Sequence, residues 1–281
     1  MRKDKIMAIN LSKNEQQLTN EVMGKISLSK DKVNLEKHVI NLSKTVIDLS
    51  KKSDVDLSAL KAKVVVVLDY SGSARPLYND GTVQETLKRL VPLGLTFDDN
   101  GEVDVYLFQD DYCHLEGMTM HNYDDYVREV IGHSGYRFGG TQYAPVLNAI
   151  INGASRTQQV ASEKKGLFGR TKTVVKNTVV HEDALVDDND PTFILFITDG
   201  NNSDHGATNK LLRETSGKNV FIQFIGIGHE KFEYLRKLDD LDGRVRDNTG
   251  FTQMDSLRKV GDNELYTEVL EQFSQWLKGL Q

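Results

Sequence analysis

Short runs of apolar residues recur along the sequence from Lys63 onward. Most of these runs contain few polar residues, which is typical of strands buried on both faces of a sheet. They predict six strands, over residues 64–68, 103–108, 112–118, 193–198, 220–226 and 248–251. Because residues 112–118 follow the preceding run after only a few residues, we expect them to pair with it as a short antiparallel edge strand.

Amphipathic segments lie between these runs, and their apolar residues recur with the period of a helix. They predict helices over residues 82–94, 124–131, 142–151, 207–215 and 231–238. The last helix is the clearest, with one apolar stripe made by Leu265, Val269, Phe273, Trp276, Leu277 and Leu280. Alternating strands and helices predict an α/β fold with a doubly wound, mostly parallel sheet. We therefore expect a six-stranded sheet of this kind, with one short antiparallel edge strand.

The first 61 residues follow a different pattern. Four seven-residue units stand in register, ISLSKDK, VNLEKHV, INLSKTV and IDLSKKS, and INLSKNE repeats the theme earlier in the chain. The aliphatic-x-Leu alternation in each unit favours short strands. A helical seam is the alternative, because spacings of four and three residues separate Leu35, Val39, Leu42, Val46 and Leu49. Both structures fit the pattern, and we favour short strands.

Two regions and one insertion follow from these patterns. Residues 1–61 contain too little apolar surface for a core of their own, so we expect this Leu-x-Lys repeat segment to dock on the main domain or on a partner. The main domain is expected over residues 62–281. Within it, residues 156–190 are polar, with a basic first half and an acidic second half. We expect this stretch to be a surface insertion.

The charge of the chain argues against one class of function. The 281 residues carry a formal net charge of −6, which disfavours nucleic-acid binding through a basic surface. The lysines of the repeat segment could nevertheless meet an acidic lipid or protein surface, so peripheral membrane contact stays open. The single cysteine, Cys113, excludes an internal disulfide and fits a reducing compartment. With no long apolar run and no signal-peptide pattern, the sequence predicts a soluble cytoplasmic protein.

Polar side chains follow the predicted strands where the carboxyl ends of those strands meet. Asp69 comes directly after the first strand, and Asp199 directly after a later one. Ser71 and Ser73 follow Asp69, and Thr141 lies in a Gly-Gly-Thr turn before a helix. Ligands of a doubly wound sheet bind outside the carboxyl ends of its strands, so these five side chains are expected to converge. Two carboxylates and three hydroxyls suit Mg²⁺, Mn²⁺ or Ca²⁺ and not Zn²⁺ or Cu²⁺.

The order of these residues has a known counterpart. Asp-x-Ser-x-Ser, then Thr in a Gly-Gly-Thr turn, then Asp-Gly resembles the metal-ion-dependent adhesion site (MIDAS) of von Willebrand factor A (vWA) domains, over about residues 63–281. The resemblance implies a parallel sheet with one short antiparallel edge strand, wrapped by helices. It implies that Ser71, Ser73 and Thr141 touch the ion directly. It also implies that Asp69 and Asp199 act partly through water and that the sixth position is left for a partner's carboxylate.

Longer stretches are similar to bacterial tellurium-resistance proteins with a vWA domain. These stretches are GTVQETLKRLVPLGLTFDDNGEVDVYLF, GGTQYAPVL, IQFIGIG and RVRDNTGF, and the Leu-Ser-Lys repeats resemble strand openings of that system's calcium-binding proteins. One departure is Ala74-Arg75, where many relatives carry Met after the second serine. The resemblance implies a divalent-metal-dependent protein-binding module in a cytoplasmic response to tellurite and other toxic cations. Its partners would be proteins with an acidic ligand residue, among them other tellurium-resistance proteins.

A second class of function uses the same ion. A metal-dependent hydrolase or phosphatase would polarise a phosphoryl oxygen with it, and would need a general base or nucleophile nearby. The sequence shows no Ser-His-Asp set, no Cys-His pair and no Gly-rich phosphate loop. The two site serines already serve as expected ligands. We therefore expect a protein-binding module and no enzyme activity.

Overall fold

The computed structural model describes residues 15–24, 32–165, 171–256 and 258–280. One six-stranded sheet runs through it in the order β3-β2-β1-β6-β7-β8. Its strands are β1 (Lys63–Asp69), β2 (Asp104–Phe108), β3 (Tyr112–His114), β6 (Thr192–Thr198), β7 (Val220–Ile227) and β8 (Thr249–Met254). Neighbours pair in parallel except β2 and β3, which are antiparallel. The α/β fold with a mostly parallel sheet and one short antiparallel edge strand is confirmed.

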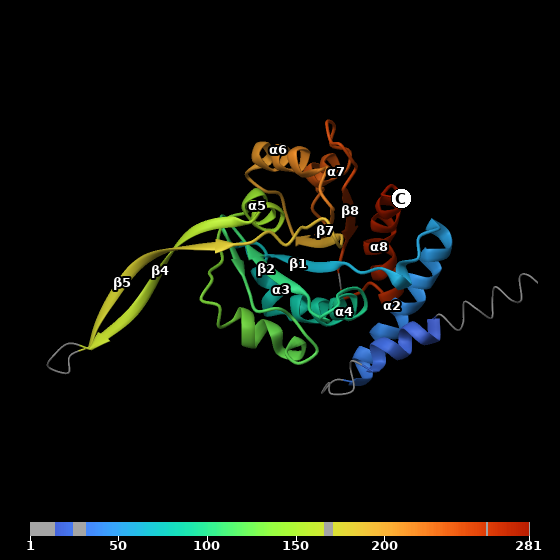
Figure 1. The fold of residues 1–281 in the computed structure, drawn as a ribbon, viewed down its shortest axis with the longest axis horizontal. Helices are drawn as coiled ribbons and strands as arrows, with labels where there is room; N and C mark the ends of the chain where they lie inside the picture. The colour runs from blue at the N-terminus through green and yellow to red at the C-terminus, as the bar shows by residue number, and fades with distance from the viewer. Residues whose placement is uncertain (1–14, 25–31, 166–170, 257, 281) are drawn as a thin grey trace, which may run out of the picture.

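Helices cover both faces of this sheet, with α5, α6 and α7 on one side and α4 and α8 on the other (Figure 1). Their bounds are α2 (Lys32–Ser53), α3 (Arg75–Asn79), α4 (Thr82–Phe97), α5 (Ala144–Asn152), α6 (His205–Thr215), α7 (Glu233–Asp239) and α8 (Asp262–Lys278). A further helix covers residues 15–24, and shorter helical turns lie at Leu57–Ala59, Tyr123–Asp125 and Val127–Ile131. In the described ranges, no helix is both long and apolar enough to cross a membrane.

Strand β1 shows how the sequence builds the two layers. Val64, Val66 and Leu68 pack into the core on the α4 and α8 side, whereas Val65 and Val67 pack into the core on the α5 side. Successive side chains of a strand point to opposite faces, so a strand covered on both faces needs an unbroken apolar run. This central position between β2 and β6 brings the end of β1 to the middle of the carboxyl edge of the sheet.

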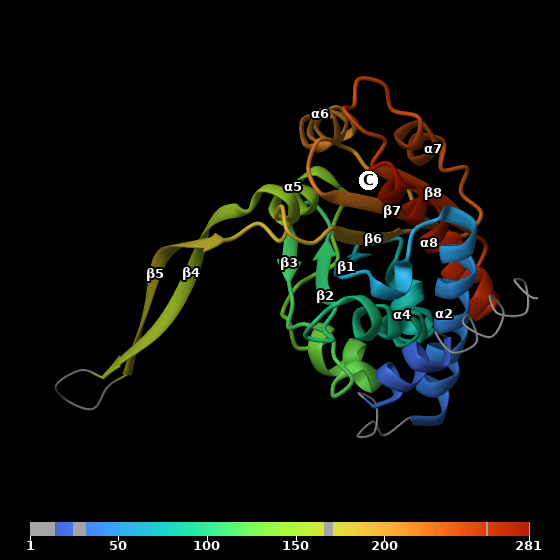
Figure 2. The same ribbon diagram turned by 45° about the vertical axis from the view of Figure 1, so that its right-hand side comes forward.

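The repeat segment is helical, so the expectation of short strands is wrong. Its residues 32–53 form the single helix α2. The helical seam is buried, with exposures of at most 2% for Leu35, Val39, Leu42, Val46 and Leu49. Helix α2 lies beside α8 and also packs against α4, so this segment docks on the main domain (Figure 2). The repeat copies at 9–15 and 26–32 lie almost wholly outside the described residues.

The polar stretch expected as a surface insertion contains a long antiparallel hairpin. It consists of β4 (Ala154–Lys165) and β5 (Thr171–Glu182), which form a separate two-stranded sheet. The hairpin projects away from the body of the molecule beyond α5 (Figures 1 and 2). Because the chain returns from it to place β6 beside β1, the hairpin does not interrupt the main sheet.

Candidate metal centre

Asp69 is the last residue of β1, and its carboxylate fixes the loop that follows. The residue is only 5% exposed. Its Oδ1 accepts a hydrogen bond from the backbone N–H of Ser71 at 2.8 Å, and its Oδ2 accepts one from the hydroxyl of Thr198 at 2.6 Å. Since Thr198 ends β6, the Asp69 carboxylate joins the carboxyl ends of two neighbouring strands.

The loops after β1 and β6 bring a line of oxygen atoms together. Because these strands are parallel neighbours, Asp69 and Asp199 leave the sheet at the same edge. The hydroxyl oxygens of Ser71 and Ser73 lie 3.0 Å apart. The Ser73 hydroxyl donates a hydrogen bond to Oδ1 of Asp199 at 3.1 Å. Four of the five residues expected to hold an ion are therefore linked through hydrogen bonds at one point of the edge.

Thr141, the fifth expected ligand, is placed by backbone contacts. The N–H of Gly72 donates to the carbonyl oxygen of Gly139 at 3.0 Å, which joins the loop before α5 to the loop after β1. The N–H and the hydroxyl of Ser203 donate to the carbonyl oxygen of Thr141, at 2.8 and 3.1 Å, which joins it to the loop after β6. Among the described residues the Thr141 hydroxyl makes no hydrogen bond to the other four side chains, so its lone pairs are available.

The two carboxylates of the site repel each other. Burial raises the pKa of Asp69, although hydrogen bonds from Ser71 and Thr198 oppose the shift. Burial, followed by the charge of Asp69, raises the pKa of Asp199 to about 6. Within the part of the chain that the structure describes, no lysine or arginine forms an ion pair with either carboxylate. The edge of the sheet therefore holds negative charge that the described side chains do not neutralise.

These residues fit a hard divalent cation. Carboxylate and hydroxyl oxygens are the ligands that Mg²⁺, Mn²⁺ and Ca²⁺ prefer, and a cation near both carboxylates would offset the repulsion that raises the Asp199 pKa. The described residues contain no group of three or more His, Cys, Asp or Glu side chains placed to share an ion. An ion at this edge would therefore depend on the serine and threonine hydroxyls as well as on the two aspartates.

Comparison with known proteins shows the family to which this chain belongs. A model of the vWA-TerF-like family, described as the vWA domain found in the TerF C terminus, matches residues 61–281. The chain belongs to the vWA-TerF-like family. The matched residues contain all five expected ligands, whereas α2 lies outside them. This vWA domain protein is also 34% identical over 224 residues to "Uncharacterized protein YcbR" of Bacillus subtilis (strain 168), and the match covers 79% of this chain and 80% of that protein.

Solved structures with a similar course of the chain are more distant in sequence. Proximal thread matrix protein 1 (PTMP1) of the mussel byssus is 16% identical with a TM-score of 0.43, covering 77% of this chain and 47% of that one. A structure of the same mussel protein with a zinc-occupied MIDAS motif has the same identity and score, and covers 81% and 51%. The ArnB paralog VWA2 from Sulfolobus acidocaldarius is 17% identical with a TM-score of 0.36, covering 76% and 46%. The chain spans about half the length of each of these.

Further residues of the vWA domain support its expected ligands, and sequence reasoning missed two of them, Tyr143 and Thr198. The hydroxyl of Tyr143 lies 3.2 Å from Oγ1 of Thr198 and 2.7 Å from the carbonyl oxygen of Gly200, to which it donates. Both oxygens of Asp204 accept backbone hydrogen bonds, from Tyr143 at 3.0 Å and from Ala144 at 2.8 Å. Asp204 therefore ties the start of α5 to the loop after β6. The only sequence signal was position, because Tyr143 and Thr198 lie within two residues of expected ligands.

Proposed function

We propose that this chain is a divalent-metal-dependent protein-binding module with a MIDAS. Asp69, Ser71, Ser73, Thr141 and Asp199 would hold Mg²⁺, or Ca²⁺ or Mn²⁺ in its place. When bound, the ion supplies a positive charge with one open coordination position, which an acidic side chain of a partner protein fills. The observation that carries this proposal is the hydrogen-bonded line from Ser71 through Ser73 to Asp199, which ends on carboxylates that no described cation neutralises.

The family supports a cellular setting for this module. The family is described as the vWA domain found in the TerF C terminus. Stretches such as GGTQYAPVL and RVRDNTGF are also similar to tellurium-resistance proteins. We therefore place the chain in a cytoplasmic response to tellurite and other toxic cations, with other tellurium-resistance proteins as partners. Helix α2 exposes Lys37, Lys44 and Lys51, so an acidic surface is a second possible contact for the chain.

The alternative is a metal-dependent hydrolase or phosphatase, and one observation favours it. His229 and Asp255 lie 3.4 Å apart and line a hollow of about 390 Å³ that Ser73 and Asp199 also line. Their side chains are 84% and 74% exposed, so neighbouring groups hold them less firmly than a general base requires. We therefore prefer the binding module, with no enzymatic role. Turnover of p-nitrophenyl phosphate with Mg²⁺ that is lost in Thr141→Ala would establish the hydrolase instead.

Metal binding by the full chain tests the proposal directly. We expect Mg²⁺ at 100 times its dissociation constant to stabilise the wild type by about 2.7 kcal/mol, because the ion binds only the folded state. Asp69→Ala should lose this stabilisation and keep its far-UV circular dichroism spectrum, since Asp69 lies at the end of a strand and outside both apolar cores. Asp188→Ala, which removes an exposed carboxylate, is the matched control and should respond like the wild type. Equal stabilisation of Asp69→Ala by Mg²⁺ would overturn the proposal.

A further inference from the structure

One exposed guanidinium lies at the rim of the site. Arg75 is the first residue of α3 and stands two positions after Ser73. Its guanidinium carbon is 4.7 Å from the centre of the Phe138 ring. Phe138 directly precedes Gly139, which is hydrogen-bonded to the loop after β1 and lies two positions before Thr141. The Arg75 side chain therefore spans the two loops that carry the three expected hydroxyl ligands.

A stack of aromatic rings holds this guanidinium in place. The Phe138 ring lies parallel to the ring of Tyr70, with 3.8 Å between the ring centres and 14° between the planes. Tyr70 meets the edge of Tyr78 at 5.0 Å, and the Tyr78 hydroxyl donates to the carbonyl oxygen of Asp69 at 2.9 Å. The face of Arg75 thus rests on a support that is continuous with the end of β1. A side chain ordered in advance loses less conformational entropy when it binds a ligand.

The hydrogen-bond donors of Arg75 have no partner among the residues that the structure describes. Among the described residues it forms no ion pair and no hydrogen bond with a carboxylate. In the two loops that meet here, the carboxylates of Asp69 and Asp110 accept hydrogen bonds from the backbone N–H groups of Ser71 and Gly140, at 2.8 and 2.9 Å. A guanidinium stacked on a ring by its face keeps its edge free, and that edge carries donors in a fork that matches a carboxylate.

We propose that Arg75 binds a second carboxylate of the partner, beside the one that fills the open position at the metal. The partner surface is then an acidic segment with two carboxylates a few residues apart, and a single acidic side chain satisfies only half of the site. This inference rests on the function proposed above and adds the chemistry of the partner to it. Arg75 follows Ser73 by two residues and is not one of the five expected ligands, so this second contact would select among acidic partners without changing the metal.

Synthetic peptides can test this with the full chain. The probes are Gly/Ser peptides that carry either one glutamate or two glutamates separated by one to four residues, and calorimetry in Mg²⁺ measures their affinity. We expect the best two-glutamate peptide to bind the wild type about fivefold more tightly than the one-glutamate peptide, since an exposed ion pair contributes at most that much. In Arg75→Gln this advantage should disappear, while the one-glutamate peptide and Mg²⁺ bind as before. Arg75→Lys should keep only part of it.

Controls separate this proposal from the function on which it rests. Arg137→Gln removes an exposed charge from the loop that carries Phe138, and it should leave the advantage of the two-glutamate peptide intact. An equal loss in that variant would overturn the proposal, because it would show that any nearby positive charge attracts the peptide. If the wild type binds both peptides equally well and EDTA abolishes the binding of both, the Arg75 contact is overturned and the metal module stands. An advantage that persists in EDTA and vanishes in Arg75→Gln supports the Arg75 contact but refutes the metal module. Binding of neither peptide overturns both.

Discussion

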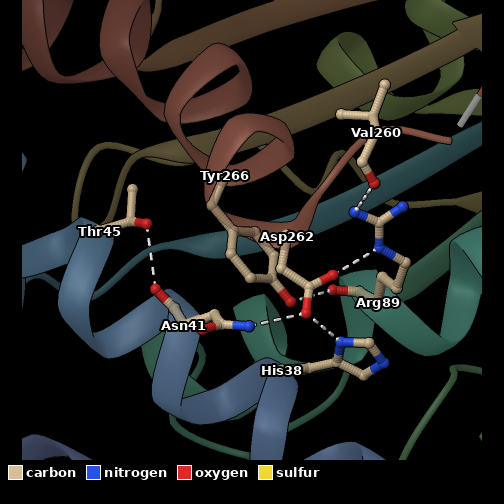
Figure 3. A network of polar contacts seen from close by, with 7 residues as sticks. All are labelled: His38, Asn41, Thr45, Arg89, Val260, Asp262 and Tyr266. Carbon is tan, nitrogen blue, oxygen red and sulfur yellow. Dashed lines mark hydrogen bonds and ion pairs between the residues drawn. The ribbon is translucent and has the colours of Figure 1, made fainter.

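A single carboxylate joins three helices on the α4 and α8 side of the sheet, and Asp262→Asn should weaken the whole fold. Asp262 is the first residue of α8 (Figure 3). Its Oδ1 accepts a hydrogen bond from Nε of Arg89 on α4 at 2.7 Å. Its Oδ2 accepts from Nδ1 of His38 at 2.7 Å and from Nδ2 of Asn41 at 3.0 Å, both on α2. The amide would remove the charge that all three donors share.

The size of the effect follows from burial. The side chains of Arg89 and Asp262 are only 10% and 14% exposed. Removing one partner of a buried ion pair costs about 3–5 kcal/mol, because the other charge stays buried without compensation. The asparagine oxygen keeps one acceptor, and Arg89 retains its hydrogen bond to the carbonyl oxygen of Val260 at 2.8 Å. We therefore expect the lower end of that range, a loss of about 3 kcal/mol.

Urea unfolding at pH 7, followed by the fluorescence of Trp276, measures this loss. Trp276 is the single tryptophan of the chain and packs in α8 against Phe221 and Phe273, so its signal reports the helix that Asp262 begins. The matched control is Asp125→Asn, which disrupts an exposed ion pair with Arg128 and should cost less than about 0.5 kcal/mol. A loss below about 1 kcal/mol in Asp262→Asn would refute the reasoning from burial.

The dependence on pH identifies the cause. Burial raises the pKa of Asp262, but hydrogen bonds from His38 and Asn41 and the charges of His38 and Arg89 outweigh it and hold that pKa well below its usual range. An acid with a lowered folded pKa stabilises the protein above its unfolded pKa of about 3.9 and loses this effect as the pH falls further. The difference in stability between wild type and Asp262→Asn should therefore shrink below about pH 4. A difference that stays constant down to pH 3 would contradict the ion pair.

Two further changes test other parts of the structure. Leu42→Ala should cost about 3 kcal/mol in urea unfolding because Leu42 is fully buried on α2, whereas Ile40→Ala, at a residue 46% exposed, should change stability by less than about 0.5 kcal/mol; equal effects would contradict the helical seam. Burial, then the charges of Asp247 and Asp240, raises the pKa of Asp239 to about 6. Because this pKa is higher in the folded than in the unfolded protein, ionisation of Asp239 lowers the stability of the wild type as the pH rises toward and through it. The free energy of unfolding of Asp239→Asn should therefore rise relative to that of the wild type between pH 5 and pH 7. A difference that does not change with pH would count against this.

The sheet was predictable because its signals are local. Each buried strand is a short apolar run, and the run at 64–68 differs from β1 (Lys63–Asp69) by one residue at each end. Strand β8 was predicted over 248–251 but extends to Met254. Its second half, TQM, carries no apolar run, and it becomes a strand because its backbone pairs with β7. The end of this strand is therefore determined by its pairing with β7 and not by the local sequence pattern.

The expected site followed from the same logic, but its supporting contacts did not. Residues placed directly after parallel strands must emerge at one edge, so the order of strands is enough to predict that Asp69 and Asp199 are neighbours. Tyr143 reads in the sequence as an ordinary core aromatic. Its role depends on where the carbonyl oxygen of Gly200 lies, which the end of β6 decides. The contact of Arg75 with Phe138 likewise depends on how two distant loops approach each other.

The Asp262 network was hidden for a related reason. Its donors His38 and Arg89 lie 224 and 173 positions away in the sequence. In the sequence, His38 and Asn41 lie among the lysines of the repeat segment, so the pattern indicates that they are exposed to solvent. Only the packing of α2 against α8 turns that side of the helix toward a carboxylate. Polar contacts between distant elements follow from the fold, whereas apolar patterns help to determine it.

The repeat segment has a sequence that fits both a helix and a strand, and packing against the main domain determines which of the two forms. In a strand, Ile40 and Leu42 would share a face, because alternate residues point the same way. In the helix they do not, and the structure leaves Ile40 46% exposed while Leu42 is fully buried. A seven-residue repeat with an aliphatic residue at one position and leucine two later satisfies both periods, so the pattern alone cannot decide. The surfaces of α4 and α8 decide it, because a single helix covers them with one continuous apolar seam and satisfies its own backbone hydrogen bonds.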